Sequence, residues 1–188
     1  MMRVVIMSNQ HQTQNSTLDQ VLVKKSVHSK QIVDVKQKIV KLVIFCLADE
    51  WYAFYGHNIR EILPKDTPVF FVPGCPKSLT GEINVRGEIE SVINISMVLQ
   101  LATNEQSGPQ NIVLLAKSAM SKEMSSGISV NKVIDVVDVP ERIIQSPPET
   151  LPDHIRPYVL SVLEFKGHAV TVLNLDQIFK DYQQGLEA

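Results

Sequence analysis

The sequence predicts a mainly β protein made of two similar lobes, each a small curled sheet closed by one short helix. Most of the chain after residue 38 consists of short apolar or alternating segments separated by turn residues, which is typical of β-strands. Residues 92–99 and 172–179 match in residue type at nearly every position, each as a strand followed by a polar cap and an apolar helical turn. Gly87 interrupts an apolar row, as glycine does where a strand in a small barrel turns a corner.

The ordered domain is expected to span residues 39–184. Residues 1–38 are rich in Gln, Ser, Asn, Thr and Lys without a steady apolar period, so we expect a mobile polar leader there. Residues 185–188 are expected to form a short tail. Residues 41–48 are apolar on both faces and predict a strand that is buried on both sides.

A hairpin turn at Asp49-Glu50 is expected to lead into an aromatic strand at 51–55. Ile59, Ile62 and Leu63 then recur at helical offsets, and Pro64 prevents a helix from continuing. This segment is either one short helical turn or a bent strand. A bend rich in proline and glycine follows it.

The stretch GEINVRGEIESVINI, residues 81–95, has apolar residues at the odd positions 83, 85, 89, 93 and 95, and its even positions include Asn84, Arg86, Glu88 and Glu90. This period of two predicts one long, half-buried strand. Gly87 is expected to relieve crowding where this strand bends, and Arg86 to point toward solvent. A short helix at 96–102, capped by Ser96, is expected to follow.

The second half of the chain is expected to repeat these kinds of element. The predicted elements are strands at 111–116 and 128–139, an irregular proline-rich connection at 142–157, a hairpin over 158–175 with Lys166-Gly167 as its turn, and a helix capped by Asp176.

Composition excludes several broad classes of protein. A net charge of −2 and a pI of about 6.2 argue against a nucleic-acid-binding protein. No apolar run approaches the ~18 residues that a membrane helix needs, so no direct membrane insertion is expected. The two cysteines, Cys46 and Cys75, form no CxxC pair, which favours a cytoplasmic protein with reduced thiols.

The residues with chemical potential do not form a recognisable catalytic pattern. No serine lies in a G-x-S-x-G turn, the histidines lack metal-ligand spacing, and no glycine-rich loop is suited to phosphate. Glu88 and Glu90 share a face of the expected strand, but a solvated edge explains them better than a pair of catalytic carboxyl groups. We therefore expect a binding module rather than an enzyme, with neither a metal nor a cofactor.

Several segments in a fixed order resemble the CheW-like family of chemosensory coupling proteins. They are KLVIFCLADEWYAF from Lys41, IREI at 59–62, VPGCPKSLTGEINVRGEIESVINI at 72–95, and LNLDQIF at 173–179. The resemblance extends from Lys41 to Tyr182 and leaves out the leader.

This resemblance implies a CheW-like fold of two intertwined, SH3-like, five-stranded β-barrel subdomains with short helices and an apolar groove between them. It also implies a non-catalytic adaptor. Such proteins dock onto the cytoplasmic tips of methyl-accepting chemoreceptors and onto the regulatory domain of a CheA-type histidine kinase.

The partner-binding residues that the resemblance implies are Ile59, Glu61, Ile62 and Arg86. The two isoleucines would be buried against a receptor helix, and Arg86, held by Glu61, would set its orientation. Ordinary core packing is the other reading of the isoleucines. Arg86 could instead be a solvated residue that pairs with Glu88.

The chain departs from the family pattern at Ser91, Asn94 and Ser161, where proline, aspartate and glycine are usual. These departures concern the identity of the partners, and both a flagellar and a pilus-based pathway stay open. The alternative function is a small-ligand sensor that binds a metabolite in the groove between the lobes.

Overall fold

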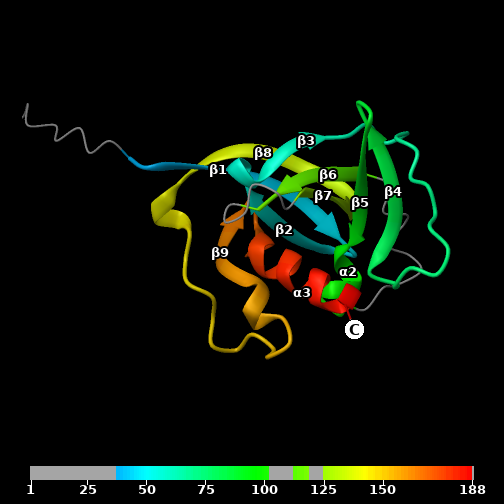
Figure 1. The fold of residues 1–188 in the computed structure, drawn as a ribbon. Helices are drawn as coiled ribbons and strands as arrows, with labels where there is room; N and C mark the ends of the chain where they lie inside the picture. Colours follow the sequence, from blue (N-terminus) through cyan, green and yellow to red (C-terminus); the bar gives the residue numbers. More distant parts are fainter. Residues whose placement is uncertain (1–36, 102–111, 119–124, 188) are drawn as a thin grey trace, which may run out of the picture. The chain divides into compact units, whose positions relative to one another are not determined.

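The computed structural model describes residues 37–101, 112–118 and 125–187, and the expected leader lies almost entirely outside these ranges. Within them the chain is mainly β (Figure 1). The strands are β1 (Ile39–Leu47), β2 (Glu50–Tyr55), β3 (Ile59–Ile62), β4 (Leu79–Val85), β5 (Glu88–Asn94), β6 (Ile112–Lys117), β7 (Ser125–Val130), β8 (Lys132–Pro140), β9 (Val159–Phe165) and β10 (His168–Leu173). The α-helices are α2 (Ile95–Val98) and α3 (Leu175–Glu187), and short 3-10 turns are η1 (Gly56–Asn58), η3 (Glu141–Ile143) and η4 (Arg156–Tyr158).

The strands form two five-stranded sheets with the same connectivity, which confirms the predicted fold class. Sheet A has the order β8-β1-β2-β10-β9 and sheet B the order β3-β6-β7-β5-β4. Each contains one parallel pair, β2 with β10 in sheet A and β7 with β5 in sheet B. Each half of the chain gives one hairpin to one sheet and three strands to the other, so the sheets are intertwined.

Each sheet curls until its two edges are joined by the connecting chain. After edge strand β3 the chain reaches the opposite edge, where Phe70 pairs with Glu82 of β4. After edge strand β8, Gln145 pairs in the same way with Val162 of β9. In each sheet one isolated β-bridge, rather than a continuous row of strand pairs, links the chain that follows one edge strand to the other edge strand.

The largest buried cluster lies between the sheets. It combines side chains of sheet A such as Phe45 and Phe54, side chains of sheet B such as Ile93 and Leu114, and one side of α3. Smaller clusters fill the inside of sheet A around Leu163 and the inside of sheet B around Ile83. Burial of this apolar surface is the main favourable contribution to folding.

The expectation of one continuous strand at 81–95 is wrong. The chain reverses at Arg86-Gly87 and forms the antiparallel hairpin of β4 and β5. Both turn residues have positive φ, 56° at Arg86 and 95° at Gly87, as a tight two-residue hairpin turn requires. Gly87 is needed for this turn rather than for a bend within a strand.

The single strand expected at 128–139 is likewise two strands. β7 belongs to sheet B and β8 to sheet A, and Asn131 lies at the crossing point. Its backbone N–H donates to the Cys46 carbonyl and its side-chain oxygen accepts from the Ala48 N–H, which ties the crossing to the end of β1. An uninterrupted pattern of β-favouring residues cannot reveal that a strand changes sheets.

Both helix caps lie two residues before the expected positions. The side-chain oxygen of Asn94 accepts a hydrogen bond from the Met97 N–H, and that of Asn174 accepts one from the Gln177 N–H. Ser96 is the second residue of α2 rather than its cap. Asp176 lies in the first turn of α3.

The structure confirms the internal similarity and extends it. A spacing of 80 residues relates Asn94 to Asn174 and the Arg86-Gly87 turn to the Lys166-Gly167 turn, which was predicted correctly. The segment at 57–65 is a 3-10 turn followed by strand β3, so its strand interpretation is the right one.

Candidate functional site

Three of the four candidate docking residues, Ile59, Glu61 and Ile62, lie on β3, which forms one edge of sheet B, and the fourth, Arg86, lies in the β4–β5 turn. Ile59 is partly buried and packs against the cluster between the sheets, so the core reading applies to it. Ile62 leaves 38% of its surface exposed. Of the two isoleucines, Ile62 is the one that a partner can reach.

Arg86 and Glu61 form an ion pair at the surface. The Arg86 Nη2 group donates to both carboxylate oxygens of Glu61, at 2.9 and 3.1 Å. The Arg86 side chain is 77% exposed and the Glu61 side chain 34%. The pair connects the β4–β5 turn to β3, and it places a guanidinium group beside Ile62's strand.

A second ion pair joins Arg60, the residue directly before Glu61, to Glu90, and it was not predicted from the sequence. The Arg60 Nη1 group donates to Glu90 Oε1 at 2.8 Å and to the Ser125 hydroxyl at 2.7 Å. The Ser125 hydroxyl in turn donates to Glu90 Oε2 at 2.8 Å. We call these three residues the Arg60 triad.

Glu90 is therefore not part of a solvated edge, because its side chain is only 8% exposed. The hairpin turn pairs Ile83 with Glu90 across the strands, so Glu90 points to the same side as the buried Ile83. Because the turn contains two residues, odd-numbered residues of β4 near the turn pair with even-numbered residues of β5, and the two sets point to the same side. An Arg-Gly pair inside an alternating stretch was the signal that could have revealed this.

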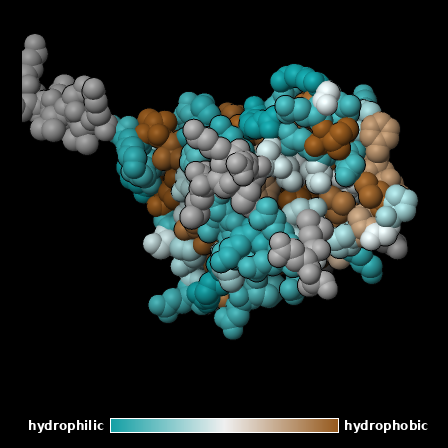
Figure 2. Space-filling model, in the orientation of Figure 1, coloured by the Kyte–Doolittle hydropathy of each residue, from teal (hydrophilic) through white to brown (hydrophobic). Residues whose placement is uncertain are grey.

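Exposed apolar side chains are present on sheet B and on the chain that joins its edges. Ile89 of β5 is 64% exposed, and Phe70 and Phe71 in the β3–β4 connection are 59% and 76% exposed. Figure 2 shows brown and tan surface gathered over the end of the protein that holds β4 and β5. Exposed apolar surface of this kind is typical of binding faces.

Sheet A carries an ion pair in the equivalent place. Lys166, in the β9–β10 turn, contacts Asp135 of edge strand β8 at 2.9 Å. The hydrogen bond from Lys166 lowers the pKa of the Asp135 carboxyl group. Val136 follows Asp135 as Ile62 follows Glu61, and it is 47% exposed. An edge-to-turn ion pair is thus a shared feature of both sheets.

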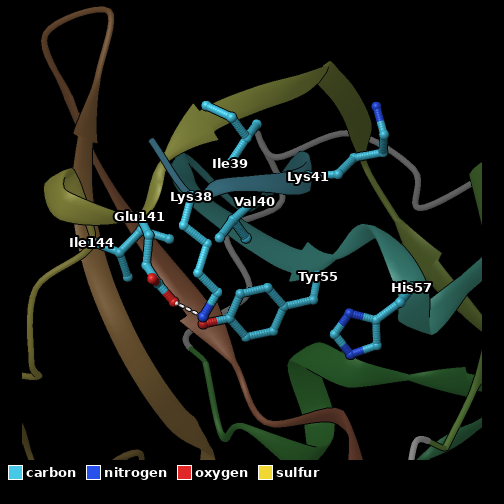
Figure 3. A pocket seen from close by; sticks show the side chains of 8 residues that line it. All are labelled: Lys38, Ile39, Val40, Lys41, Tyr55, His57, Glu141 and Ile144. Carbon is cyan, nitrogen blue, oxygen red and sulfur yellow. Dashed lines mark hydrogen bonds and ion pairs between the residues drawn. The ribbon is translucent and has the colours of Figure 1, made fainter. Parts of the chain in front are cut away.

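A shallow pocket of about 450 Å³ lies at the beginning of β1, on sheet A (Figure 3). Tyr55 and His57 stack with their ring centroids 5.5 Å apart, and Lys38 contacts Glu141 at 2.6 Å. The hydrogen bond to Glu141 raises the pKa of Lys38. This pocket does not lie between the sheets, where the buried cluster occupies the space.

Among the described residues, the charged side chains of the ion pairs and the pocket meet in small groups. Across the described ranges, no three His, Cys, Asp or Glu side chains converge as metal ligands. No helix in this part of the chain is long and apolar enough to cross a membrane. The arrangement suits docking, because it combines exposed apolar groups with charges held in fixed positions.

Comparison with known proteins gives a consistent result. The family model of the CheW-like domain matches residues 41–183. The chain is 27% identical over 139 residues to the chemotaxis protein CheW of Rhizobium meliloti, covering 74% of this chain and 86% of that protein. It is 23% identical over 155 residues to the chemotaxis protein CheW of Helicobacter pylori, covering 82% and 89%.

A solved structure has the same fold. The scaffolding protein TtCheW from Thermoanaerobacter tengcongensis superimposes with a TM-score of 0.62 at 21% identity, covering 73% of this chain and 90% of that one. Because the family model spans most of the chain, including both sheets and the start of α3, the chain belongs to the CheW-like domain family.

Proposed function

We propose that this protein is a non-catalytic adaptor that couples methyl-accepting chemoreceptors to a CheA-type histidine kinase, in chemotaxis or a related chemosensory pathway. The family match over residues 41–183 carries the proposal. The relatives named chemotaxis proteins and the scaffolding protein of the same fold support it. A location in the cytoplasm, where receptor tips and kinase lie, is part of the proposal.

In this proposal the receptor docks along β3. Ile62 supplies apolar surface, whose burial stabilises the complex by roughly 25 cal/mol per Å² removed from water. Arg86, fixed by Glu61, fixes the orientation of the receptor helix through its remaining donors. Ile59 acts indirectly, because it anchors β3 to the core. The regulatory domain of the kinase is the second partner.

The alternative of a metabolite sensor finds no support in the described residues. It required a groove between the lobes, and that space is filled by buried side chains. The pocket of Figure 3 lies elsewhere, and its lysines are paired with carboxylates.

The proposal can be tested by calorimetric titration of the purified protein with a soluble receptor fragment and, separately, with the kinase regulatory domain. Binding of both is expected. Ile62→Asp should weaken receptor binding, because it places a charge in the apolar contact. Val136→Asp, at the equivalent position of sheet A, is the matched control and should leave receptor binding unchanged. Failure of the unaltered protein to bind either partner would refute the adaptor role.

A further inference from the structure

The matching connectivity of the sheets allows the Arg60 triad to be compared with its counterpart in sheet A. Arg60 is the extra residue of a β-bulge, between Ile59 and Glu61, where β3 pairs with β6. The equivalent bulge in β8 holds Ile134. Ile134 is therefore the counterpart of Arg60.

The other two members of the Arg60 triad have apolar counterparts as well. Glu90 pairs with Ile83 in the β4–β5 hairpin, as Val170 pairs with Leu163 in the β9–β10 hairpin. Val170 also pairs in parallel with Trp51, which takes the place that Ser125 has beside Glu90.

In sheet A these three positions belong to one apolar cluster. Val170 is fully buried, and Trp51 and Ile134 pack against the same core. The fold thus accommodates an all-apolar set at this place. A buried ion pair is seldom more stabilising than well-packed apolar residues of similar volume, because desolvation of the charges is costly. Closure of sheet B therefore does not require the Arg60 triad.

The geometry of Arg60 leaves part of its guanidinium group available. Both hydrogen bonds to Glu90 and Ser125 use Nη1, and no contact among the described residues engages Nε or Nη2. About a third of the side chain, 34%, is exposed. A guanidinium edge formed by Nε and Nη2 matches a carboxylate in a two-bond contact.

We propose that Arg60, held in place by Glu90 and Ser125, is a docking residue that receives a carboxylate of the receptor. Arg60 precedes Glu61, so its guanidinium group and that of Arg86 lie near the same strand. The partner chemistry that fits is an apolar surface to cover Ile62 flanked by acidic side chains. This inference rests on the proposed function, and it adds a specificity-determining residue to it.

The test transfers the residues of sheet A into sheet B in the full chain. The double variant Arg60→Ile/Glu90→Val should keep or raise the melting temperature. Its affinity for a soluble receptor fragment, measured by calorimetry, should fall at least about tenfold at low salt, because a charge-assisted contact is lost. The dependence of affinity on salt between about 0.05 M and about 0.3 M should also become weaker, because fewer charges are paired in the complex.

Two further variants sharpen the result. Arg60→Lys keeps the charge but lacks the planar fork, and it should show a partial loss of affinity. The matched control, Lys41→Ile/Asp138→Val, removes an ion pair of 2.9 Å from the surface of sheet A and should leave receptor affinity and its salt dependence unchanged.

The outcomes separate this inference from the adaptor role. If the unaltered protein binds the receptor fragment and the Arg60→Ile/Glu90→Val variant binds it equally well, with the same salt dependence, then Arg60 is not a docking residue and the adaptor role stands. A large drop in melting temperature of that variant would show that sheet B needs the Arg60 triad for folding, which would overturn the docking role proposed for Arg60. Absence of binding by the unaltered protein would refute the adaptor role itself.

Discussion

Arg86 is a surface residue whose charge contributes little to folding, and the proposed docking role predicts a larger effect on binding. Its side chain is 77% exposed and its partner Glu61 is partly exposed, and ion pairs of this kind contribute about 0–1 kcal/mol to stability. Arg86→Glu should therefore leave the melt followed by circular dichroism nearly unchanged while it weakens receptor binding. Unchanged binding in this variant would mean that the docking site lies elsewhere.

Ser161 is a buried polar residue without a compensating contact. It is 6% exposed, and its hydroxyl has no hydrogen-bond partner in the described part of the chain. The position 80 residues earlier is Gly81, which has no room for a side chain beside the Phe70 backbone. Ser161→Ala should therefore raise the free energy of unfolding by about 1 kcal/mol, because it removes a buried unsatisfied group.

Ser129 is the matched control for that substitution. It is 1% exposed and its hydroxyl donates to the Ile93 carbonyl at 3.1 Å. Ser129→Ala should lower the free energy of unfolding by about 1 kcal/mol. Urea denaturation of both variants checks the pair of predictions, and equal effects in the two proteins would contradict them.

At the scale of elements, the two-residue turns determine the register of both hairpins. Gly167 has a φ of 79°, and a Cβ atom there would meet nothing within 4 Å, so the cost of a side chain is conformational. Gly167→Ala should destabilise the protein by about 1 kcal/mol.

Gly185 lies in α3, where a Cβ atom would also meet nothing within 4 Å. Gly185→Ala should therefore stabilise the protein by about 0.5 kcal/mol, because alanine favours the helix. Thermal melts of both variants distinguish the two effects.

Several elements could be predicted from the sequence because local patterns determine them. The continuous apolar run of β1 and the Lys166-Gly167 turn of the last hairpin are examples. The Arg86-Gly87 turn was missed because alternation continues through it in the sequence, although the strand direction reverses. The division at Asn131 was missed because it depends on which sheet each strand joins.

The candidate site was only partly accessible to sequence reasoning. The family resemblance pointed to Ile59, Glu61, Ile62 and Arg86; the structure packs Ile59 against the core and brings Glu61 and Arg86 into contact. The burial of Glu90 against Arg60 follows from the hairpin register, which the sequence pattern concealed. Contacts between residues 30 positions apart require the three-dimensional arrangement.

At the scale of the whole molecule, tyrosines tie the elements together and make stability depend on pH. The hydroxyl of Tyr158, the last residue of η4, donates to Asp181 of α3 at 2.8 Å. Burial, followed by this hydrogen bond, raises the pKa of Tyr158 from 10.0 to about 12. The pKa values of Tyr52 and Tyr182 are shifted in the same direction, chiefly by burial.

The sign of the pH dependence follows from these shifts. Between pH 10 and about 12 the unfolded chain has lost the Tyr158 proton while the folded protein retains it. The free energy of unfolding should therefore fall as the pH rises through this window. Urea denaturation at successive pH values should show this fall, and Tyr158→Phe should reduce its steepness. An unchanged slope in the variant would contradict the assignment.

At the scale of the whole molecule, the two sheets match each other closely except at one place. Both sheets join an edge strand to a turn through an ion pair, Glu61 with Arg86 and Asp135 with Lys166. They differ in the residues beside that pair, which are polar in sheet B and apolar in sheet A. Two lobes of one design that differ at this place suit the proposed adaptor, which would hold two partners together.

The most direct test of the adaptor role is autophosphorylation of the kinase in a reconstituted mixture with receptor. The rate of phosphate transfer from ATP should respond to receptor ligand only when this protein is present, and Ile62→Asp should abolish most of that response. If the receptor controls the kinase equally well without this protein, the proposed coupling role is wrong.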